Sequence, residues 1–274
     1  MRFSLIGAGK TGSLFTSFLV SKGYKIDYII DKDPGKAKVL VKYLNAGKVA
    51  DSNSFPLLKG TVLIAVKDDE IRKVFEQLWE SNKEIDNFIH FSGVLTSEIF
   101  EEAKKAKKGT VSLHPNLSIK KRFMEPKVLN NTTFGVEGNE KGISFIRDFL
   151  INNGLNFYLI DRSKKIYYHS AAVFASNFTQ ILALISRKLY LEAGIDKKTA
   201  SIIVGQFLKD LVVKNETESL EKTFTGPAVR NDKKTIQNES VALESIDPDL
   251  SSLYKQLTEL IIRYSCGGDE NECK

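Results

Sequence analysis

The residues that most clearly predict chemistry stand near the start of the chain, where Gly7, Ala8, Gly9, Lys10, Thr11 and Gly12 follow one another. An apolar run at residues 3–6 precedes this segment and apolar residues at helical spacing follow it, which predicts a strand, a tight turn and a helix. In a dinucleotide-binding turn the first glycine permits the bend, the second lets the backbone approach a pyrophosphate, and the third lets the helix pack closely on the strand. The amino end of that helix would face the phosphates with N–H groups and a positive dipole. We therefore expect all six residues to bind a cofactor.

Two other interpretations of the glycine segment remain open. A phosphate-binding P-loop could end in Gly9-Lys10-Thr11, although that motif needs a glycine where Ser4 stands. The segment could also be an ordinary turn that binds nothing, although the later segments fit a dinucleotide fold as well.

The choice between NAD and NADP depends on the residues that follow the second predicted strand, at 25–30. Asp31 is placed to bind a ribose 2′-hydroxyl, as in NAD. Lys32, with Lys36 nearby, could instead meet a 2′-phosphate. We expect NADP or NAD as the cofactor, with NADP marginally favoured. The rest of the cofactor site is expected at or near later strand ends, in Val66, His90, Ser92 and Gly93.

The chain has three histidines, and their positions are informative. His90 and His114 each end a predicted strand, and ligands of open parallel sheets bind beyond the carboxyl ends of the strands. His169 lies early in a long helical stretch. We expect His114 to bind substrate, although any of the three could be a hydrogen-bonded structural histidine.

The long helical stretch also carries the residues expected to catalyse. At about 100° per residue, Ser176 returns close to the face of His169, and Lys165 lies one turn before it. Lys165 or His169 is the candidate acid or base, Asn177 the candidate donor to a substrate oxygen, and Ser176 a candidate substrate contact. The alternative is a packed apolar helix with polar residues at its mouth.

A third motif stands at residues 223–232, where Gly226-Pro227 predicts a turn. Arg230 and Asp232 could lock that turn as an ion pair. Arg230 could equally bind the carboxylate of a substrate or a phosphate of the cofactor.

The elements that must position these residues change character near residue 161. Before it, predicted strands alternate with helices, which is typical of a doubly wound, mostly parallel sheet. After it, only helical patterns occur, near residues 163–192, 197–213, 233–243 and 248–264. We therefore expect an α/β fold with a Rossmann dinucleotide-binding domain at residues 1–160 and an all-α domain for substrate binding and dimerisation at residues 161–274.

Composition narrows the class further. The net charge of +6 is spread over separate lysine pairs without interleaved aromatics, which argues against nucleic acid as a partner. No signal peptide and no apolar run of membrane-spanning length is evident, so we expect a cytoplasmic protein without a membrane partner. The only cysteines, Cys266 and Cys273, lie in a predicted frayed tail, and we expect no metal site and no disulfide framework.

The chain resembles a known family over nearly its whole length. The resemblance rests on Gly7 to Gly12, His90-Phe91-Ser92-Gly93, His114-Pro115, Tyr168-His169 with Ser176-Asn177, and Thr225-Gly226-Pro227 with Arg230 and Asp232. It is similar to proteins that join a Rossmann-like domain to a DUF2520 domain, related to F420-dependent NADP oxidoreductases, pyrroline-5-carboxylate reductases and 6-phosphogluconate dehydrogenases. The resemblance implies a nicotinamide-binding fold and a helical second domain that dimerises, but no particular reaction.

Two residues depart from the family pattern. Family members often carry Arg-Gly-Asp where this chain has Arg230-Asn231-Asp232, which puts the tight turn in doubt. Many also have a histidine near the position of Glu239.

Together these features predict an NAD(P)-dependent oxidoreductase that transfers a hydride to or from a small carbonyl or imine substrate. A 2-keto acid such as ketopantoate is one candidate, by analogy with related reductases. The alternatives are a non-catalytic NAD(P)-binding sensor or assembly module, and a reductase that uses a deazaflavin partner. A sensor would need the glycine turn but not Lys165 together with His169.

Overall fold

The computed structural model describes residues 1–265. The expected tail with Cys266 and Cys273 lies outside the described residues. The chain divides into two compact units, Met1–Gln180 and the part from Ile181 onward. Each unit is described by itself.

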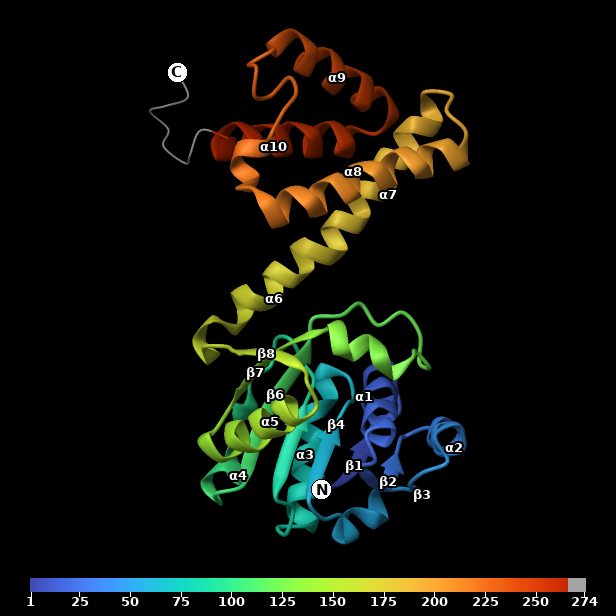
Figure 1. Cartoon of the computed structure of the whole chain (residues 1–274), viewed down its shortest axis with the longest axis vertical. Helices are drawn as coiled ribbons and strands as arrows, with labels where there is room; N and C mark the ends of the chain where they lie inside the picture. Colours follow the sequence, from blue (N-terminus) through green and yellow to red (C-terminus); the bar gives the residue numbers. More distant parts are fainter. Residues whose placement is uncertain (266–274) are drawn as a thin grey trace. The chain divides into compact units, whose positions relative to one another are not determined.

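An eight-stranded sheet forms the centre of the first unit, in the order β3-β2-β1-β4-β5-β6-β7-β8 (Figure 1). The strands are β1 (Arg2–Ile6), β2 (Lys25–Ile30), β3 (Lys48–Ala50), β4 (Thr61–Ile64), β5 (Asn87–His90), β6 (Gly109–Pro115), β7 (Thr133–Gly138) and β8 (Asn156–Leu159). Neighbours from β3 to β6 are parallel, whereas β7 runs antiparallel to β6 and β8 runs parallel to β7. The carboxyl ends of β1, β4, β5 and β6 therefore meet at one edge of the sheet, as the sequence predicts.

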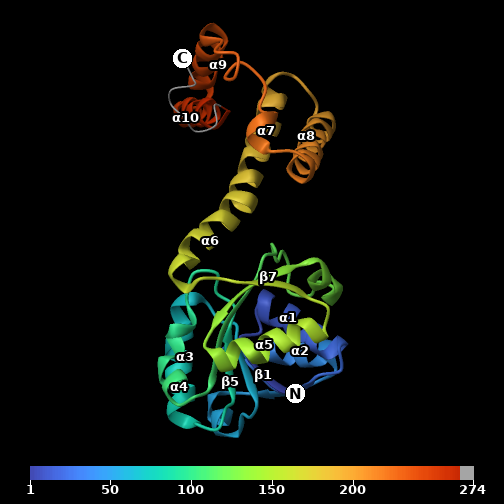
Figure 2. The same ribbon diagram turned by 60° about the vertical axis from the view of Figure 1, so that its left-hand side comes forward.

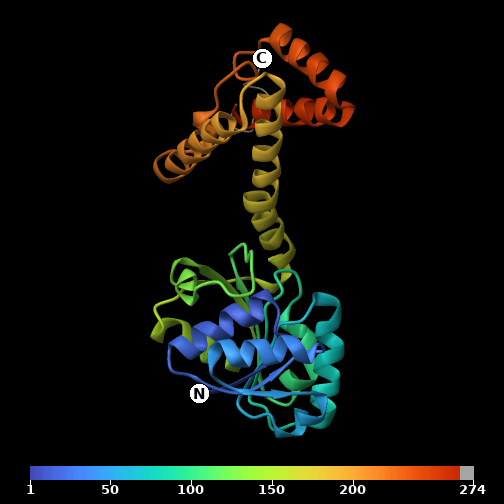
Figure 3. The same cartoon turned by 90° about the vertical axis from the view of Figure 1, so that its right-hand side faces the viewer.

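Helices cover both faces of this sheet (Figures 2 and 3). The α-helices are α1 (Lys10–Ser21), α2 (Pro34–Leu44) and α5 (Glu140–Asn152) on one face, and α3 (Asp68–Ser81) and α4 (Glu101–Lys105) on the other. Short 3₁₀ turns lie at η1 (Ser52–Leu57), η2 (Ser97–Phe100), η3 (Pro126–Asn131) and η4 (Arg162–Lys164). The doubly wound Rossmann-like fold is confirmed.

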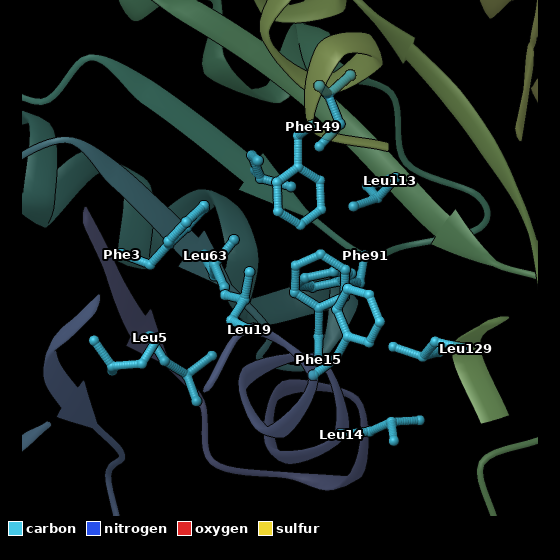
Figure 4. Packing of buried hydrophobic residues seen from close by; sticks show 14 of the residues in the cluster. Phe3, Leu5, Leu14, Phe15, Leu19, Leu63, Phe91, Leu113, Leu129 and Phe149 are labelled. Atoms are coloured by element: carbon cyan, nitrogen blue, oxygen red, sulfur yellow. The ribbon is translucent and has the colours of Figure 1, made fainter. Parts of the chain in front are cut away.

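A cluster of aromatic side chains fills the core between the sheet and the first helix (Figure 4). The Phe15 ring of α1 lies 5.0 Å from that of Phe91 and between 6.1 and 6.4 Å from those of Phe18, Phe134 and Phe149, measured between ring centroids. These rings come from α1, α5, β7 and the segment after β5, so the cluster joins the helix that follows the glycine turn to the end of β5, to β7 and to α5.

The long helical stretch of the sequence is not one regular helix. It contains α6 (Lys165–Val173), a π-helical turn η5 (Phe174–Phe178) and α7 (Thr179–Glu192). A π-turn shifts the side chains that follow it around the helix axis, and such turns occur frequently at functional sites. The assumption of 100° per residue therefore holds from Lys165 to Val173 but not through Ser176 and Asn177.

The boundary between the units lies inside α7, between Gln180 and Ile181. The secondary structure does change after β8, near the residue 160 boundary expected from the sequence. The compact first unit extends further because side chains of α6, including Lys165 and Tyr168, form hydrogen bonds with the sheet and its loops.

The second unit consists of helices throughout its described part. They are α8 (Lys197–Thr217), η6 (Leu220–Thr223), α9 (Lys233–Ile246) and α10 (Pro248–Ser265), after the end of α7. Asn231 adopts a φ of 53° in the turn before α9, a left-handed conformation that asparagine tolerates better than most residues and that glycine adopts easily. The tight turn thus forms without the family's glycine. Among residues 1–265, no helix is both long and apolar enough to cross a membrane.

We expect Phe15→Ala to lower the free energy of unfolding by about 3–5 kcal/mol, because the substitution leaves a cavity among the packed rings. Urea denaturation measures the change. Ile151→Ala is the control, since Ile151 of α5 is 60% exposed and its loss should stay within about 0.5 kcal/mol. Equal effects of the two substitutions would contradict the role of the aromatic cluster.

Candidate functional site

The glycine turn has the shape that its spacing predicts. Gly7 has a φ of +99°, and a Cβ there would lie 2.5 Å from the carbonyl oxygen of Ala65. A Cβ at Gly12 would collide with the carbonyl oxygen of Gly7, so the helix could not pack this closely. A Cβ at Gly9 would meet no atom within 4 Å. The middle glycine thus borders open space before α1, where a phosphate group can approach the backbone.

Asp31 holds the glycine turn in place. One of its carboxylate oxygens accepts a hydrogen bond from the Ala8 N–H (2.7 Å) and the other from the Asp33 N–H (2.9 Å). Lys32 forms an exposed ion pair with Glu70, with an N–O distance of 2.7 Å. Of the other residues expected at the turn, Thr11 is half-buried and Lys10 is exposed as the first residue of α1.

Arg122 is a cation near the glycine turn whose role the sequence did not indicate, because it stands in a run of charged residues that suggests solvated surface. Its guanidinium donates to the carbonyl oxygen of Lys36 (2.6 Å) and lies 3.4 Å from the Ser13 hydroxyl. The loop after β6 is thereby tied to the first turns of α1 and α2. No sequence pattern could have indicated this contact, since it joins segments 86 and 109 residues apart.

His90 is completely buried and positions the loop after β5. Its Nε2 donates to the carbonyl oxygen of Thr96 (3.2 Å), and its Nδ1 accepts from the Ser92 N–H (3.2 Å). Burial lowers the pKa of His90 to about 3, and the charge of Lys165 adds to this effect. The imidazole is therefore neutral, and its two hydrogen bonds hold the backbone between Ser92 and Thr96 in place.

Ser92 and Gly93 complete this loop. The Ser92 hydroxyl donates to the carboxylate of Asp68 on α3 (2.8 Å) and accepts from the Leu95 N–H (2.9 Å). A Cβ at Gly93 would lie 2.5 Å from Nδ1 of His169 and 2.9 Å from Nε2 of His114. The loop brings the last two histidines together, and it needs glycine at this position to do so.

Lys165 points into the protein. Its ammonium donates to the carbonyl oxygen of Leu95 and to the Ser112 hydroxyl, and it lies 3.5 Å from a carboxylate oxygen of Glu137. The side chain is 2% exposed. Burial lowers the pKa of Lys165 to about 8, opposed by the attraction of Glu137. This geometry makes Lys165 an anchor between α6, β6 and the loop after β5.

Glu137 on β7 is the buried counter-charge of Lys165, and it is not among the site residues predicted from the sequence. It accepts hydrogen bonds from the Ser97 N–H and hydroxyl and from the Arg162 guanidinium (3.2 Å). The sequence offers one signal for it, a single acidic residue among the apolar residues of a buried strand. Buried carboxylates require partners, so its presence implied a cation nearby.

A cavity of about 530 Å³ opens at the carboxyl end of β6. Its walls combine a stretch after β6, Tyr158 of β8, α6 and the π-turn. The polar lining residues are His114, Asn116, Ser118, Tyr158, Tyr168, His169, Ser176 and Asn177, and the apolar ones include Ala171, Ala172 and Ala175. The structure therefore brings together His114, His169, Ser176 and Asn177, as the sequence predicts, whereas Lys165 and Val66 are not among the lining residues.

The rings of the two cavity histidines lie edge to face. The ring centroids of His114 and His169 lie 5.9 Å apart at 77°. Burial lowers the pKa of His114 to about 4, with further lowering by His169 and Lys165 and a smaller opposing effect of Asp68. His114 is thus a neutral imidazole at neutral pH.

The residues of the third sequence motif belong to the second unit. Asp232 accepts hydrogen bonds from the N–H (3.1 Å) and hydroxyl (2.7 Å) of Thr235 and so caps α9. Arg230 is exposed. Glu239 accepts a hydrogen bond from the hydroxyl of Tyr254 on α10.

Comparison with known proteins agrees with this architecture. The fold and the glycine turn define a Rossmann-like protein with a helical carboxyl-terminal region, and residues 132–261 match the model of the family described as domain of unknown function DUF2520. Residues 132–261, which begin just before β7, thus match a DUF2520 domain, and the resemblance expected from the sequence is confirmed. No curated protein matches the chain.

Three solved structures share the fold over nearly their whole length. Protein TM1727 from Thermotoga maritima is 28% identical, with coverage of 96% of this chain and 98% of that chain and a TM-score of 0.72. A provisionally assigned NADP oxidoreductase from Bacteroides fragilis is 19% identical, with coverage of 95% and 97% and a TM-score of 0.77. A pyrroline carboxylate reductase from Plasmodium falciparum, solved with NADP bound, is 13% identical, with coverage of 98% and 100% and a TM-score of 0.61.

We expect the buried ammonium of Lys165 to make stability depend on alkaline pH. Its pKa is about 8 in the folded protein and 10.5 ordinarily, so between these values the unfolded chain binds more protons than the folded one. The free energy of unfolding should therefore rise with pH in this window, by roughly 3 kcal/mol.

Urea denaturation at several pH values measures the free energy of unfolding, and comparison of two lysine variants shows whether Lys165 causes the rise. Lys165→Met should be less stable overall, because it leaves Glu137 without one of its cations, and should lack the rise. Lys164→Met replaces the exposed neighbouring lysine and should keep it. The same pH dependence in both variants would show that Lys165 is not the titrating group.

Proposed function

We propose that this chain is a cytoplasmic NAD(P)-dependent oxidoreductase that transfers a hydride to or from a small carbonyl or imine substrate. The observation that supports it best is the open glycine turn at the same sheet edge as the cavity lined by His114 and His169. From β1 to β6 there are three inter-strand spacings, or about 14 Å along that edge. An extended dinucleotide anchored at the turn can thus reach toward the cavity.

The residues at the glycine turn fit a dinucleotide. Gly9 leaves space for a pyrophosphate, and the first turn of α1 presents N–H groups to it. Arg122 supplies positive charge at the first turns of α1 and α2. Lys32, which is paired with Glu70, and Lys36 stand nearby in the chain, whereas both oxygens of Asp31 already accept backbone hydrogen bonds. This arrangement, and the NADP named for two of the similar structures, favour NADP over NAD.

The side chains that would act on the substrate are those at the cavity. His169 stays a candidate acid or base and Asn177 a candidate hydrogen-bond donor, with Ser176 beside them. Lys165, the other candidate acid or base, would act by holding α6 against the loop after β5 rather than by touching the substrate. When bound, the nicotinamide would accept or supply the hydride, and the protein would orient the substrate and handle the proton.

The cavity indicates a class of substrate rather than a single compound. A cavity of about 530 Å³ with alanines and several hydrogen-bonding groups suits a small polar molecule. A 2-keto acid such as ketopantoate remains one candidate by analogy, and Arg230 remains a candidate for binding its carboxylate.

The described part of the second unit supports a homodimer. Among residues 181–265, the buried ones are Ala200, Ser240, Ser251 and Thr258, none of which is a large apolar side chain. Large apolar residues of α8 are instead exposed, with Phe207 at 64% and Val212 and Val213 at 57% each. A unit without its own apolar core needs a covering surface, and a second copy of the same helices supplies one by two-fold symmetry.

We expect Gly9→Val to abolish dinucleotide binding while the fold survives, because a Cβ there meets no protein atom within 4 Å and the side chain would fill the open space beside the turn. Fluorescence titration with NADPH and NADH measures the binding. Gly205→Val of α8 is the control, since a Cβ there also meets nothing within 4 Å. Unchanged affinity in Gly9→Val would contradict the cofactor site.

Turnover separates the enzyme from a dinucleotide-binding sensor. The wild-type protein is mixed with NADPH and each of a panel of keto acids and imines. Oxidation of NADPH with any one of them supports the proposal. Binding of the dinucleotide without turnover of any member, in either direction, would favour the sensor.

We expect light scattering at micromolar concentration to give the mass of two chains. Phe207→Asp should raise the dimer dissociation constant by about tenfold or more, because a charge would replace a large apolar side chain in the contact. Lys42→Asp of α2, an exposed position in the first unit, should leave the mass unchanged. A monomeric wild-type mass would contradict the dimer.

A further inference from the structure

A hydrogen-bonded chain leads from the backbone of β7 to His114, and it begins at Asn116. The Asn116 amide contacts the carbonyl oxygen of Thr133 (3.1 Å) and the hydroxyl of Tyr158 (2.9 Å) with one end and the hydroxyl of Tyr168 (3.0 Å) with the other. A backbone carbonyl can only accept a hydrogen bond, so the amide nitrogen must face Thr133. The amide oxygen of Asn116 therefore faces Tyr168.

The orientation of Asn116 determines where the proton of Tyr168 goes. An amide oxygen only accepts, and a tyrosine hydroxyl has a single proton, so Tyr168 donates that proton to Asn116. The hydroxyl oxygen of Tyr168 also lies 2.6 Å from Nδ1 of His114. Since the tyrosine proton is already used, the proton of this second bond belongs to the histidine. His114 is then the tautomer with hydrogen on Nδ1 and a lone pair on Nε2.

The lone pair lies beside the loop after β5, on a residue that lines the cavity. Nε2 of His114 and Nδ1 of His169 both lie within 2.9 Å of the point where Gly93 would carry a Cβ. Nδ1 of His169 has no hydrogen-bond partner among the described residues. His114 and His169 also line the cavity. Two imidazole nitrogens thus converge beside the loop after β5, and one of them is an acceptor.

The surrounding groups keep this acceptor available. Burial and the charges of neighbouring groups lower the pKa of His114 to about 4, so its Nε2 stays unprotonated at neutral pH. Gly135 of β7 leaves the space for Tyr168, since a Cβ there would lie 2.6 Å from the tyrosine hydroxyl oxygen. The lining residues of the cavity include no Asp, Glu, Lys or Arg. No charged side chain of the lining competes for the lone pair.

We propose that Nε2 of His114 is the proton acceptor of the site, and that the substrate class it serves is a small alcohol or amine with a hydrogen on the adjacent carbon. This proposal rests on the proposed function and deepens it. As the C–H bond breaks, its electron pair leaves as hydride to the dinucleotide, the proton of the O–H or N–H bond passes to Nε2, and a C=O or C=N bond forms. The Nδ1–H bond to Tyr168 orients the ring and stabilises the imidazolium that results.

The tautomer can be observed without turnover, in the full chain labelled with ¹⁵N-histidine. A two-bond ¹⁵N–¹H correlation spectrum resolves three imidazoles, since the chain has three histidines, and His114→Gln assigns the relevant one. We expect His114 to carry hydrogen on Nδ1. His114 with hydrogen on Nε2 in the wild-type protein would overturn the proposal.

Two variants test whether the chain of hydrogen bonds sets the tautomer. Asn116→Ala at an exposed position removes the acceptor of the tyrosine proton, so Tyr168 can donate to Nδ1 and the hydrogen of His114 should move to Nε2. Tyr168→Phe removes the partner of Nδ1 and should give a mixture of tautomers. Tyr167→Phe is the matched control, since Tyr167 is 75% exposed, and it should leave the spectrum of His114 unchanged. An unchanged tautomer in Asn116→Ala would also contradict the proposal.

The proton-accepting role has its own measurement. For an alcohol or amine that the wild-type protein oxidises with NADP, His114→Gln should lower turnover by about 10²–10⁴-fold and leave NADP affinity unchanged. Full turnover in His114→Gln would overturn the role even if the tautomer is as expected. Gly9→Val tests only the dinucleotide site. Failure of the proposed cofactor site and failure of the proposed tautomer are therefore distinguishable.

Discussion

The buried ion pair of Lys165 and Glu137 is the interaction on which the candidate site depends. An ammonium that is 2% exposed is costly unless partners compensate it, and here they come from β6, β7 and the loop after β5. None of these segments can move away without leaving a charge or a hydrogen-bonding group unpaired. The pair thus fixes the first turn of α6 against the strand ends. Tyr168 and His169, on the next turn, take their places at the cavity for the same reason.

Two glycines leave the space that the rings at the cavity need. Gly93 and Gly135 each occupy a position where a Cβ would lie within 2.9 Å of a functional ring atom, in the histidine pair and in Tyr168 respectively. Any larger residue would push the ring of His114, His169 or Tyr168 out of its hydrogen-bonding position. These glycines provide room for side chains rather than backbone freedom, which distinguishes them from Gly7 with its positive φ.

Much of the fold follows from local patterns in the sequence. Gly7 and Gly12 meet constraints that act within one turn, and the alternation of strands and helices is equally local, so both could be predicted. The antiparallel pairing of β7 depends on the path of the connection after β6, and the π-turn at Phe174–Phe178 depends on backbone hydrogen bonds, neither of which residue types reveal. The spacing of Lys165 and His169 placed both on α6. It could not show that Lys165 meets a carboxylate on β7, because that contact joins residues far apart in the sequence.

The molecule separates charged groups from the groups that line its cavity. Lys165, Glu137, Arg162 and Asp68 all hold segments together through hydrogen bonds or ion pairs. The cavity is lined by imidazoles, tyrosines, an asparagine and serines, without Asp, Glu, Lys or Arg, and burial lowers the pKa of His114 to about 4. In the proposed reaction the proton of the substrate would therefore create a positive charge on His114, and no charged side chain of the lining would compensate that charge. The charged groups thus hold the segments in place, and the side chains that line the cavity take their positions from those segments.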